Sequence, residues 1–409
     1  MNITTTPTPF PIGRDKSLTP HAALPLETVL AQLAAAAARP FEEARPIPPA
    51  LHHSPAFAER ERERIFTQEW ICIGRADEIT KPGDYLTHEI AGVPIIALRQ
   101  ADRSVKAFVN ACAHRFSRLL KEEQGSCRRV ICPYHAWAYD LGGQLLRAPF
   151  MEMKQGFDKS AHRLKELHAE VWEGFLYVTL AETPSKSLAQ ALAPFTEGVV
   201  GRFDMACYQT VFRETMTWTA NWKNLMENFI ESYHVPMAHG KTFAKHSKPL
   251  TDYICGEDSD HYGYHRAPQP SDEPPGAAHP KNHRLEGEWR RMMIDFSIYP
   301  CHLITLMPDY LWYITVQPAG PGVEGLGKMR ATWGVAFPPE VLADVPPAER
   351  DGWVANFKAY MEVANDEDKP LVEALYRGSA SPLLPDGLLH PIERNIWQFT
   401  RYLNRLCGS

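Results

Sequence analysis

Two cysteines and two histidines stand close together in the stretch NACAHRFSRLLKEEQGSCRRVICPYHAWAYD. They form two short pairs, Cys112-x-His114 and Cys132-x-x-His135. Zinc fingers usually pair cysteine with cysteine and histidine with histidine, whereas each pair here mixes the two ligand types. Mixed pairs suit a [2Fe–2S] cluster in which two thiolates hold one iron and two imidazoles hold the other. The spacing therefore predicts an electron-carrying cluster.

Imidazole ligands in place of two thiolates remove negative charge from such a cluster and raise its reduction potential. The cluster would then accept electrons from a donor of lower potential and pass them on. Cys127 lies in the same stretch, but Val130 stands where a Cys-x-x-His pair would need histidine, so we predict that Cys127 is not a ligand. In a reducing compartment, the eight cysteines of the chain are more typical of metal ligands or buried thiols than of disulfides.

A second group of chemically active side chains lies in the stretch NWKNLMENFIESYHVPMAHGKTF. Apolar residues recur there at helical spacing and predict a buried helix face. These residues are Trp222, Leu225, Met226, Phe229, Ile230 and Tyr233. Glu227, Glu231 and His234 fall on the opposite side, so two carboxylates and an imidazole share one helix face.

His239 follows five residues after His234, and on an unbroken helix the two rings would point roughly 140° apart. Pro236 lies between them, and we predict that it ends the helix, so that His239 returns from a turn toward the ion that His234 binds. Two neutral histidines and one carboxylate form the facial triad that binds Fe(II) and leaves positions for O₂ and substrate. The stretch VANDEDKPLVEALYRG offers three carboxylates, Asp366, Glu367 and Asp368.

The two motifs together resemble the catalytic α subunit of the Rieske non-haem iron oxygenases, the ring-hydroxylating oxygenase family. In that family the third iron ligand is the aspartate of an ED pair, and the matching position is Asp368, with Asp366 in reserve. The alternative is that Asp368 caps a helix whose second residue is Pro370. The resemblance covers most of residues 55–409, and its firm motifs are the cluster and the histidine stretch.

Glu231 stands three residues before His234, where the family usually carries an aspartate between the cluster of one subunit and the iron of its neighbour. The resemblance implies that Glu231 hydrogen-bonds an iron-ligand histidine and, across the subunit interface, a cluster histidine. Glu231 is therefore the candidate catalytic residue, with a solvated helix carboxylate as the alternative. Glutamate at this position resembles the branch that acts on quaternary ammonium and other N-alkyl compounds.

The resemblance implies an oxidoreductase that activates O₂ at mononuclear Fe(II), with electrons from NAD(P)H arriving through a separate reductase or ferredoxin and the [2Fe–2S] cluster. It also implies a homotrimer, because each cluster serves the iron of the next subunit. We expect a monooxygenase that hydroxylates a C–H next to nitrogen or oxygen in a small molecule, giving N- or O-dealkylation. The alternatives are an aromatic ring cis-dihydroxylating dioxygenase and a Rieske electron-transfer protein that is not an enzyme.

Aromatic residues in the C-terminal half offer a possible substrate site. Tyr299, Tyr310, Trp312 and Tyr313 could form a cage for a cationic substrate, since aromatic faces attract ammonium groups. The same four residues also fit an ordinary sheet face in the core.

The chain divides into three predicted segments within an α+β fold. Residues 1–50, rich in Pro, Thr and Ala, form an N-terminal arm, which we expect to be an appendage. Residues 51–182 hold a helix and then short β-like runs separated by turn signals such as KPGD, which predicts an all-β Rieske [2Fe–2S] domain. Residues 183–409 form the mononuclear iron catalytic domain, for which the resemblance implies an α+β helix-grip (START-like) fold with an antiparallel sheet. Residues 265–287 are polar and Pro-rich and predict a long loop.

The composition argues against nucleic acid and membranes as partners. A net charge of -6, from 43 basic and 49 acidic residues, gives no electrostatic reason to bind either a polyanion or an anionic membrane surface. No apolar run approaches the ~20 residues of a spanning helix. The N-terminus MNITTTPTPFPIGRDK lacks the pattern of a secretory signal, so we expect a cytoplasmic protein.

Overall fold

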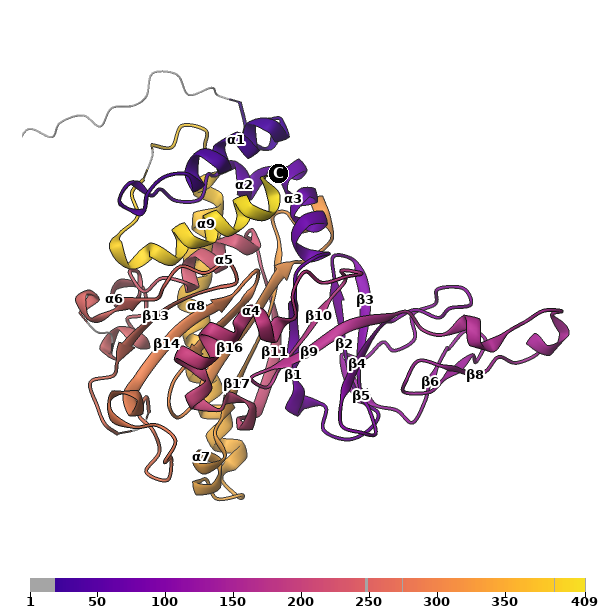
Figure 1. Cartoon of the computed structure of the whole chain (residues 1–409). Helices are drawn as coiled ribbons and strands as arrows, with labels where there is room; N and C mark the ends of the chain where they lie inside the picture. The colour runs from indigo at the N-terminus through magenta and orange to yellow at the C-terminus, as the bar shows by residue number, and fades with distance from the viewer. Residues whose placement is uncertain (1–18, 247–248, 274, 386, 409) are drawn as a thin grey trace, which may run out of the picture.

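Two seven-stranded antiparallel sheets organise the chain (Figure 1). The computed structural model describes residues 19–246, 249–273, 275–385 and 387–408. The first sheet lies within residues 71–179 and the second within 209–337, on either side of the predicted division at 182/183. The predicted α+β class with an antiparallel catalytic sheet is confirmed.

The first sheet has the strand order β1-β10-β9-β4-β3-β2-β5. Its strands are β1 (Ile71–Arg75), β2 (Asp84–Ile90), β3 (Val93–Arg99), β4 (Val105–Val109), β5 (Gln124–Ser126), β9 (Glu166–Trp172) and β10 (Phe175–Thr179). The β2–β3 hairpin closes on Ala91 and Gly92, with φ values of 52° and 84°. Positive φ at both central residues is what a type I′ turn requires, and it matches the twist of the two strands.

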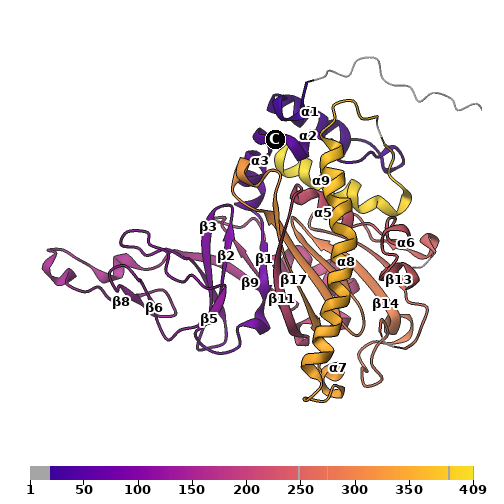
Figure 2. The same cartoon turned by 180° about the vertical axis from the view of Figure 1, so that it is seen from behind.

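A small three-stranded sheet extends the first domain away from the rest of the molecule. It consists of β6 (Val130–Ile131), β7 (Ala138–Tyr139) and β8 (Leu145–Arg147). Figures 1 and 2 both show this sheet at the end of the molecule that lies farthest from the second domain. The second predicted cluster loop, between β6 and β7, is therefore at this tip, and the first lies beside it, since the rings of His114 and His135 are 4.8 Å apart.

The second sheet has the strand order β11-β17-β16-β15-β14-β13-β12. Its strands are β11 (Gln209–Trp218), β12 (Ile254–Cys255), β13 (Tyr262–Pro268), β14 (Met292–Ile298), β15 (His302–Leu306), β16 (Leu311–Pro318) and β17 (Met329–Phe337). The α-helices are α1 (Leu26–Ala37), α2 (Ala50–His53), α3 (Pro55–Glu61), α4 (Leu188–Phe195), α5 (Trp222–Phe229), α6 (Val235–Ala238), α7 (Pro339–Asp344), α8 (Arg350–Ser379) and α9 (Arg394–Cys407). None of the described helices is long and apolar enough to cross a membrane.

Strand β16 shows how the second sheet separates two cores. Trp312 and Ile314 belong to the core that contains α5 and α9, whereas Leu311 and Tyr313 belong to the core that contains α4 and strand β10. Successive strand residues point to opposite faces of a sheet, so the run LWYI serves both cores. One face of the second sheet is therefore covered by α5, α8 and α9, as Figure 2 shows, and the other packs against the first domain.

Two sequence expectations change in the structure. The described part of the N-terminal arm does not stand off as an appendage, since Val29 and Leu33 of α1 are fully buried and α1 packs on α9 of the same chain. The predicted loop over 265–287 is shorter, because residues up to Pro268 form strand β13, where buried His265 and Ala267 alternate with less buried residues. Alternation with period two is the strand signal that the Pro-rich composition concealed.

Candidate metal centres

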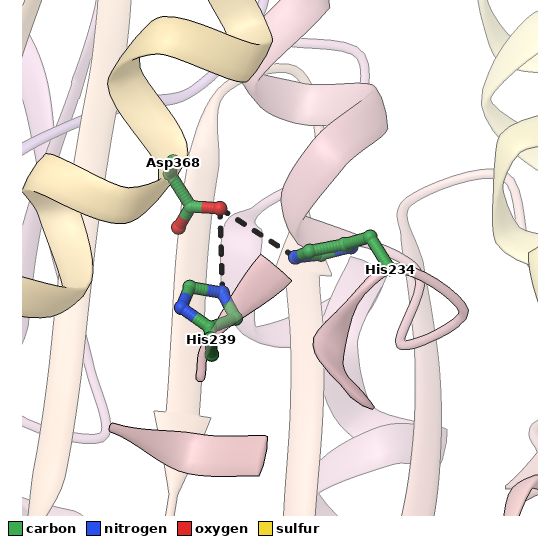
Figure 3. A group of neighbouring side chains, drawn as sticks. All are labelled: His234, His239 and Asp368. Atoms are coloured by element: carbon green, nitrogen blue, oxygen red, sulfur yellow. Dashed lines mark ion pairs between the residues drawn. The ribbon is translucent and has the colours of Figure 1, made fainter. Parts of the chain in front are cut away.

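Three ligand-type side chains meet beside the helix-covered face of the second sheet (Figure 3). His234 and His239 flank α6, and Asp368 comes from α8. Nε2 of His234 lies 3.6 Å from Oδ1 of Asp368, and Nε2 of His239 lies 3.3 Å from the same oxygen. One ligand atom from each residue lies within 4.8 Å of the others, a spacing that a metal ion with bonds of about 2 Å can bridge.

A carboxylate orients each of the two imidazoles. Nδ1 of His234 lies 2.5 Å from Oε1 of Glu231, and Nδ1 of His239 lies 3.2 Å from Oε2 of Glu367. Each ring therefore directs its remaining nitrogen, Nε2, toward Asp368. Metal-bound histidines almost always have this pattern, with one ring nitrogen on the metal and the other N–H on a carboxylate or carbonyl. The three residues fit a mononuclear Fe(II) with open positions.

The Glu231 side chain also explains why the helix ends early. Its Oε2 accepts hydrogen bonds from the backbone N–H groups of Tyr233 and His234, which an unbroken helix would pair with carbonyls four residues back. The Ile230 carbonyl accepts a hydrogen bond from Nδ2 of Asn395 at 3.0 Å instead of continuing the helix. Helix α5 thus ends at Phe229, and the prediction that Pro236 ends it is wrong.

Pro236 instead lies at the start of a separate short helix. Helix α6 begins at Val235, so Pro236 occupies one of its first two positions, where its missing N–H leaves no hydrogen bond unmade. His234 is the residue before this helix and His239 the residue after it. The break places the centroids of the two rings 5.3 Å apart. This supports the predicted chelating geometry, although Glu231 rather than Pro236 ends the helix.

Asp368 lies in the middle of the long helix α8 and does not cap a helix. Pro370 is also inside that helix, so the capping alternative is wrong. Asp368 is buried, whereas Asp366 is exposed, because residues two apart point to nearly opposite sides of a helix. Nδ2 of Asn228 donates to Oδ1 of Asp368 at 3.3 Å and lies 3.4 Å from Nε2 of His234. Asp366 has no comparable contact with the two histidines in the described structure.

The electrostatic environment of this site favours a cation. Burial disfavours a charged imidazole at His234, yet the carboxylates of Glu231, Asp368 and Asp295 outweigh it and raise the pKa of His234. A divalent metal ion would benefit from the same negative field.

The two predicted cluster loops have matching backbone hydrogen bonds. In the first, Cys112 N–H donates to the Ser117 carbonyl at 2.9 Å and Phe116 N–H donates back to Cys112 at 2.9 Å. In the second, the equivalent bonds join Cys132 to Trp137 at 2.8 Å and to Ala136 at 3.0 Å. The fifth residue of each loop has a positive φ, 60° at Phe116 and 57° at Ala136. Such a repeated turn presents one cysteine and one histidine from each loop.

The cysteines of these loops are buried, and the histidines reach the surface. Cys112 and Cys132 are 1% and 3% exposed, and the rings of His114 and His135 lie 4.8 Å apart at a steep angle. Tyr139 accepts a hydrogen bond from Ala113 N–H at 3.1 Å, which leaves its own O–H free to donate to Cys112 Sγ at 3.2 Å. The chemistry of this donor set, two thiols inside and two imidazoles outside, fits a Rieske cluster.

Cys127 lies apart from both loops along the chain, at the β5 edge. Its N–H donates to the Gly83 carbonyl at 2.9 Å, and its partly buried side chain packs against the core of the first domain. Burial raises the pKa of the Cys127 thiol. These contacts agree with a structural thiol, as the sequence predicts.

A cavity of about 110 Å³ adjoins His234, His239 and Asp368. Its aromatic lining residues are Phe229, Phe243, Tyr253, Tyr310 and Trp312. Of the four residues of the possible cage, two do not line this cavity, and for them the alternative of an ordinary core position holds. Tyr299 packs on Tyr402 at 4.8 Å, and Tyr313 lies on the opposite face of the sheet, because it follows Trp312 directly in β16. Tyr310 and Trp312 remain at the site.

Two residues at this site, Glu367 and Asn228, were not assigned a role from the sequence. Glu367 is one of the three carboxylates that the sequence offers as a ligand, but its side chain instead contacts Nδ1 of His239 and accepts from the Lys241 N–H and the Thr242 hydroxyl. Asn228 precedes Glu231 by three residues and bonds Asp368. Spacing along the 222–229 helix could have indicated Asn228, but no local pattern ties Glu367 to a histidine 128 residues away.

Comparisons with known proteins match both halves of the chain. Residues 205–409, half of the chain, match the family described as "Ring hydroxylating alpha subunit (catalytic domain)". Residues 69–162 match the "Rieske [2Fe-2S] domain". The matched Rieske region contains Cys112, His114, Cys132 and His135, and the other contains His234, His239 and Asp368.

Curated relatives are similar over part of their length. The carnitine monooxygenase oxygenase subunit of Escherichia coli (strain K12) is 32% identical over 203 residues, 48% of this chain and 53% of that protein. The glycine betaine monooxygenase oxygenase subunit of Pseudomonas aeruginosa (strain UCBPP-PA14) is 36% identical over 181 residues, 44% of this chain and 42% of that protein. The chain thus spans about half the length of the curated relatives it matches.

A solved structure has the same fold over nearly the whole chain. It is the quaternary ammonium Rieske monooxygenase CntA in complex with its substrate L-carnitine, with a TM-score of 0.74 and 23% identity. The alignment covers 94% of this chain and 99% of that one.

Proposed function

Because this chain belongs to the ring-hydroxylating alpha-subunit family and also carries the Rieske [2Fe–2S] domain, we propose that it is the oxygenase component of a monooxygenase for a small quaternary ammonium or N-alkyl compound. One oxygen atom of O₂ enters a C–H bond next to nitrogen, and the other leaves as water with two electrons and two protons. Where the hydroxylated carbon belongs to an N-alkyl group, its bond to nitrogen then breaks and that carbon leaves as an aldehyde. The monooxygenase names of both curated relatives support this outcome over ring cis-dihydroxylation and over simple electron carriage.

The observation that carries the proposal is the pair of imidazoles that carboxylates orient toward Asp368. His234, His239 and Asp368 would hold the mononuclear iron, and Cys112, His114, Cys132 and His135 would hold the cluster. When bound, the cluster supplies electrons and the iron supplies the place where O₂ is reduced.

The residues of this chain position and shield the reaction. Glu231 and Glu367 fix the ring orientations of His234 and His239, and Asn228 restrains the Asp368 carboxylate. The aromatic walls of the adjoining cavity keep bulk water from the reacting carbon, which strengthens every electrostatic contact inside.

Electrons would have to pass between subunits. The cluster tip around β6 and β8 and the iron site beside α6 lie at opposite ends of the chain in Figures 1 and 2. The tip exposes large apolar side chains, including Phe116 (83%) and Tyr134 (56%), which is typical of a surface that meets another protein. On the other side of the molecule, a hollow of about 1460 Å³ is lined by residues that include Glu231, Tyr233, His234 and Met237.

These two surfaces suit a head-to-tail association in which the cluster tip of one copy enters the hollow of the next. Different patches on each copy make a heterologous contact, which closes into a ring when the rotation permits, and three copies give the homotrimer we propose. Glu231 would lie between the cluster histidines of one copy and His234 of the other. A separate reductase or ferredoxin would deliver electrons from NAD(P)H to the exposed edge of the cluster.

Metal and sulfide analysis tests this proposal first. The oxygenase requires about three irons and two sulfides per chain, whereas an electron carrier requires about two irons. With a surrogate reductase and a panel of small quaternary amines, O₂ uptake should depend on the amine and should accompany hydroxylated or aldehyde product. O₂ uptake that does not depend on any amine, or diol formation from arenes without aldehyde, would contradict the proposed function.

A further inference from the structure

The cavity beside the iron site contains a carboxylate that does not belong to the triad. Asp295 is at the centre of β14, and its side chain is 13% exposed. It pairs in register with His265 of β13 and Thr305 of β15, and Thr305 pairs with Trp312 of β16. These four side chains form a row across the helix-covered face of the sheet, next to one another as cross-strand pairs are.

Among the described residues, the partners of Asp295 are a hydroxyl and an imidazole, with no lysine or arginine. Its Oδ1 accepts from the Thr305 hydroxyl at 2.6 Å, and its Oδ2 lies 3.3 Å from Nε2 of His265. Nδ2 of Asn395, which also donates to the Ile230 carbonyl at 3.0 Å, faces Nδ1 of His265 at 3.2 Å. Nε2 of His265 also lies 2.7 Å from the Ser232 hydroxyl. The His265 ring thus has several polar partners besides Asp295, and no lysine or arginine of the described residues pairs with that carboxylate.

The walls around Asp295 are aromatic. The rings of Phe229 and Phe243 lie 5.6 and 6.1 Å from the ring of Trp312, and Tyr310 lines the same cavity. Aromatic faces attract ammonium groups, most strongly where water is excluded, and the partly buried Asp295 carboxylate adds direct charge compensation. Among the described residues that line the cavity, none is lysine or arginine.

We propose that this cavity selects a small ammonium cation that carries no carboxylate, with Asp295 as the counter-ion of the ammonium group. The inference rests on the proposed function and narrows its substrate class. A zwitterionic quaternary amine would bring a second carboxylate into a cavity that already holds Asp295 and offers no lysine or arginine in return. The carboxylate of such a zwitterion would be unpaired and repelled by Asp295, and a site can reject a close analogue of its ligand in this way.

Calorimetric titration of the anaerobic protein with both metals bound tests the charge preference without turnover. The probes are choline, glycine betaine and 3,3-dimethylbutan-1-ol, which replaces the quaternary nitrogen of choline with carbon. Choline should bind at least about tenfold more tightly than either of the others, which corresponds to about 1.4 kcal/mol. Glycine betaine binding as tightly as choline, or no binding of choline, would overturn the inference.

The variant Asp295→Asn separates charge from packing. It should weaken choline binding about tenfold and leave binding of the uncharged alcohol within about twofold, because only the cation interacts with the lost charge. Thr305→Val is the matched control, since it removes the hydrogen bond to Asp295 but keeps the carboxylate, and it should retain most of the preference for choline. Equal weakening of choline and the alcohol in Asp295→Asn would assign Asp295 a structural role only.

The same samples distinguish this inference from the proposed function. If choline binds through Asp295 but no quaternary amine supports O₂ uptake or product formation, the proposed activity fails while the cation site stands. If glycine betaine is oxidised and binds best, the activity stands and the inference fails.

Discussion

Nδ1 of His234 lies 2.5 Å from Oε1 of Glu231, and Nε2 of the same ring faces Asp368 at 3.6 Å. The His234 imidazole thus links the Glu231 carboxylate to the proposed iron site. This carboxylate is only 8% exposed and lines the large hollow. The carboxylate has three acceptor contacts within its own chain, with Nδ1 of His234 and the N–H groups of Tyr233 and His234. It is held in place before any partner subunit arrives.

Glu231→Gln should keep both metals and slow electron transfer to the iron. The amide is uncharged and has one acceptor oxygen where the carboxylate has two, so it cannot hold both the His234 ring and the backbone N–H groups. Product formation in a single turnover should therefore fall by roughly 100-fold. Stopped-flow absorbance of the cluster and product quenching measure the two steps. Glu227→Gln, on the same stretch but paired with His52, is the control. Unchanged single-turnover transfer in Glu231→Gln would refute this role.

Glu367→Gln should weaken iron binding without affecting the cluster. Its two carboxylate oxygens contact Nδ1 of His239, the Thr242 hydroxyl and the Lys241 N–H, and the single amide oxygen of glutamine cannot accept from all three. We expect the dissociation constant of the mononuclear iron to rise by roughly 10- to 100-fold. Competition with a chelator measures this constant, and the visible spectrum reports the cluster. Wild-type iron affinity in the variant would show that His239 needs no such partner.

Asp368→Ala and Asp366→Ala should differ sharply. Asp368 is buried beside both histidines, whereas Asp366 faces solvent from the same helix. Iron content should therefore fall from about three to about two per chain in the first variant and stay at three in the second. Elemental analysis after gel filtration decides the matter. Loss of iron in Asp366→Ala alone would transfer the ligand role to that residue.

His88 should make stability depend on pH. Burial, with Arg330 and Arg213 nearby, lowers the pKa of His88 to about 3. The unfolded chain binds this proton near pH 6.5, so the stabilising contribution is complete above pH 6.5 and is lost as pH falls toward 3. Between pH 7 and pH 5 the wild type should lose about 2 kcal/mol more unfolding free energy than His88→Gln. Urea unfolding at both pH values measures this, and an equal loss in both proteins would contradict it.

The sequence predicts most of the metal-ligand candidates because they lie in short stretches. Cys112, His114, Cys132 and His135 stand in two tight loops, so spacing alone indicates their chemistry. His234 and His239 are also near neighbours, but how they converge could not be deduced from helix periodicity. The helix break at Ile230 depends on the Glu231 side chain and on Asn395, which comes from the last helix of the chain.

Local sequence patterns could not predict which residues come together only because their strands pair in the sheet. Asp295, Thr305 and Trp312 lie on three strands, and their row depends on the strand register of residues 292–318. Tyr313 was grouped with Trp312 by composition, although a period of two places them on opposite faces. Asp368 was reached through resemblance to a family, since a carboxylate inside a helix carries no local mark of metal binding.

The most direct test of the account is a single turnover of the reduced holoprotein with O₂ and no reductase, across small quaternary amines. The account predicts that one amine gives hydroxylated or aldehyde product, that cluster oxidation accompanies product formation, and that Asp368→Ala abolishes product while its cluster can still be reduced. Cluster oxidation with no product from any amine, or equal product from Asp368→Ala, would contradict it.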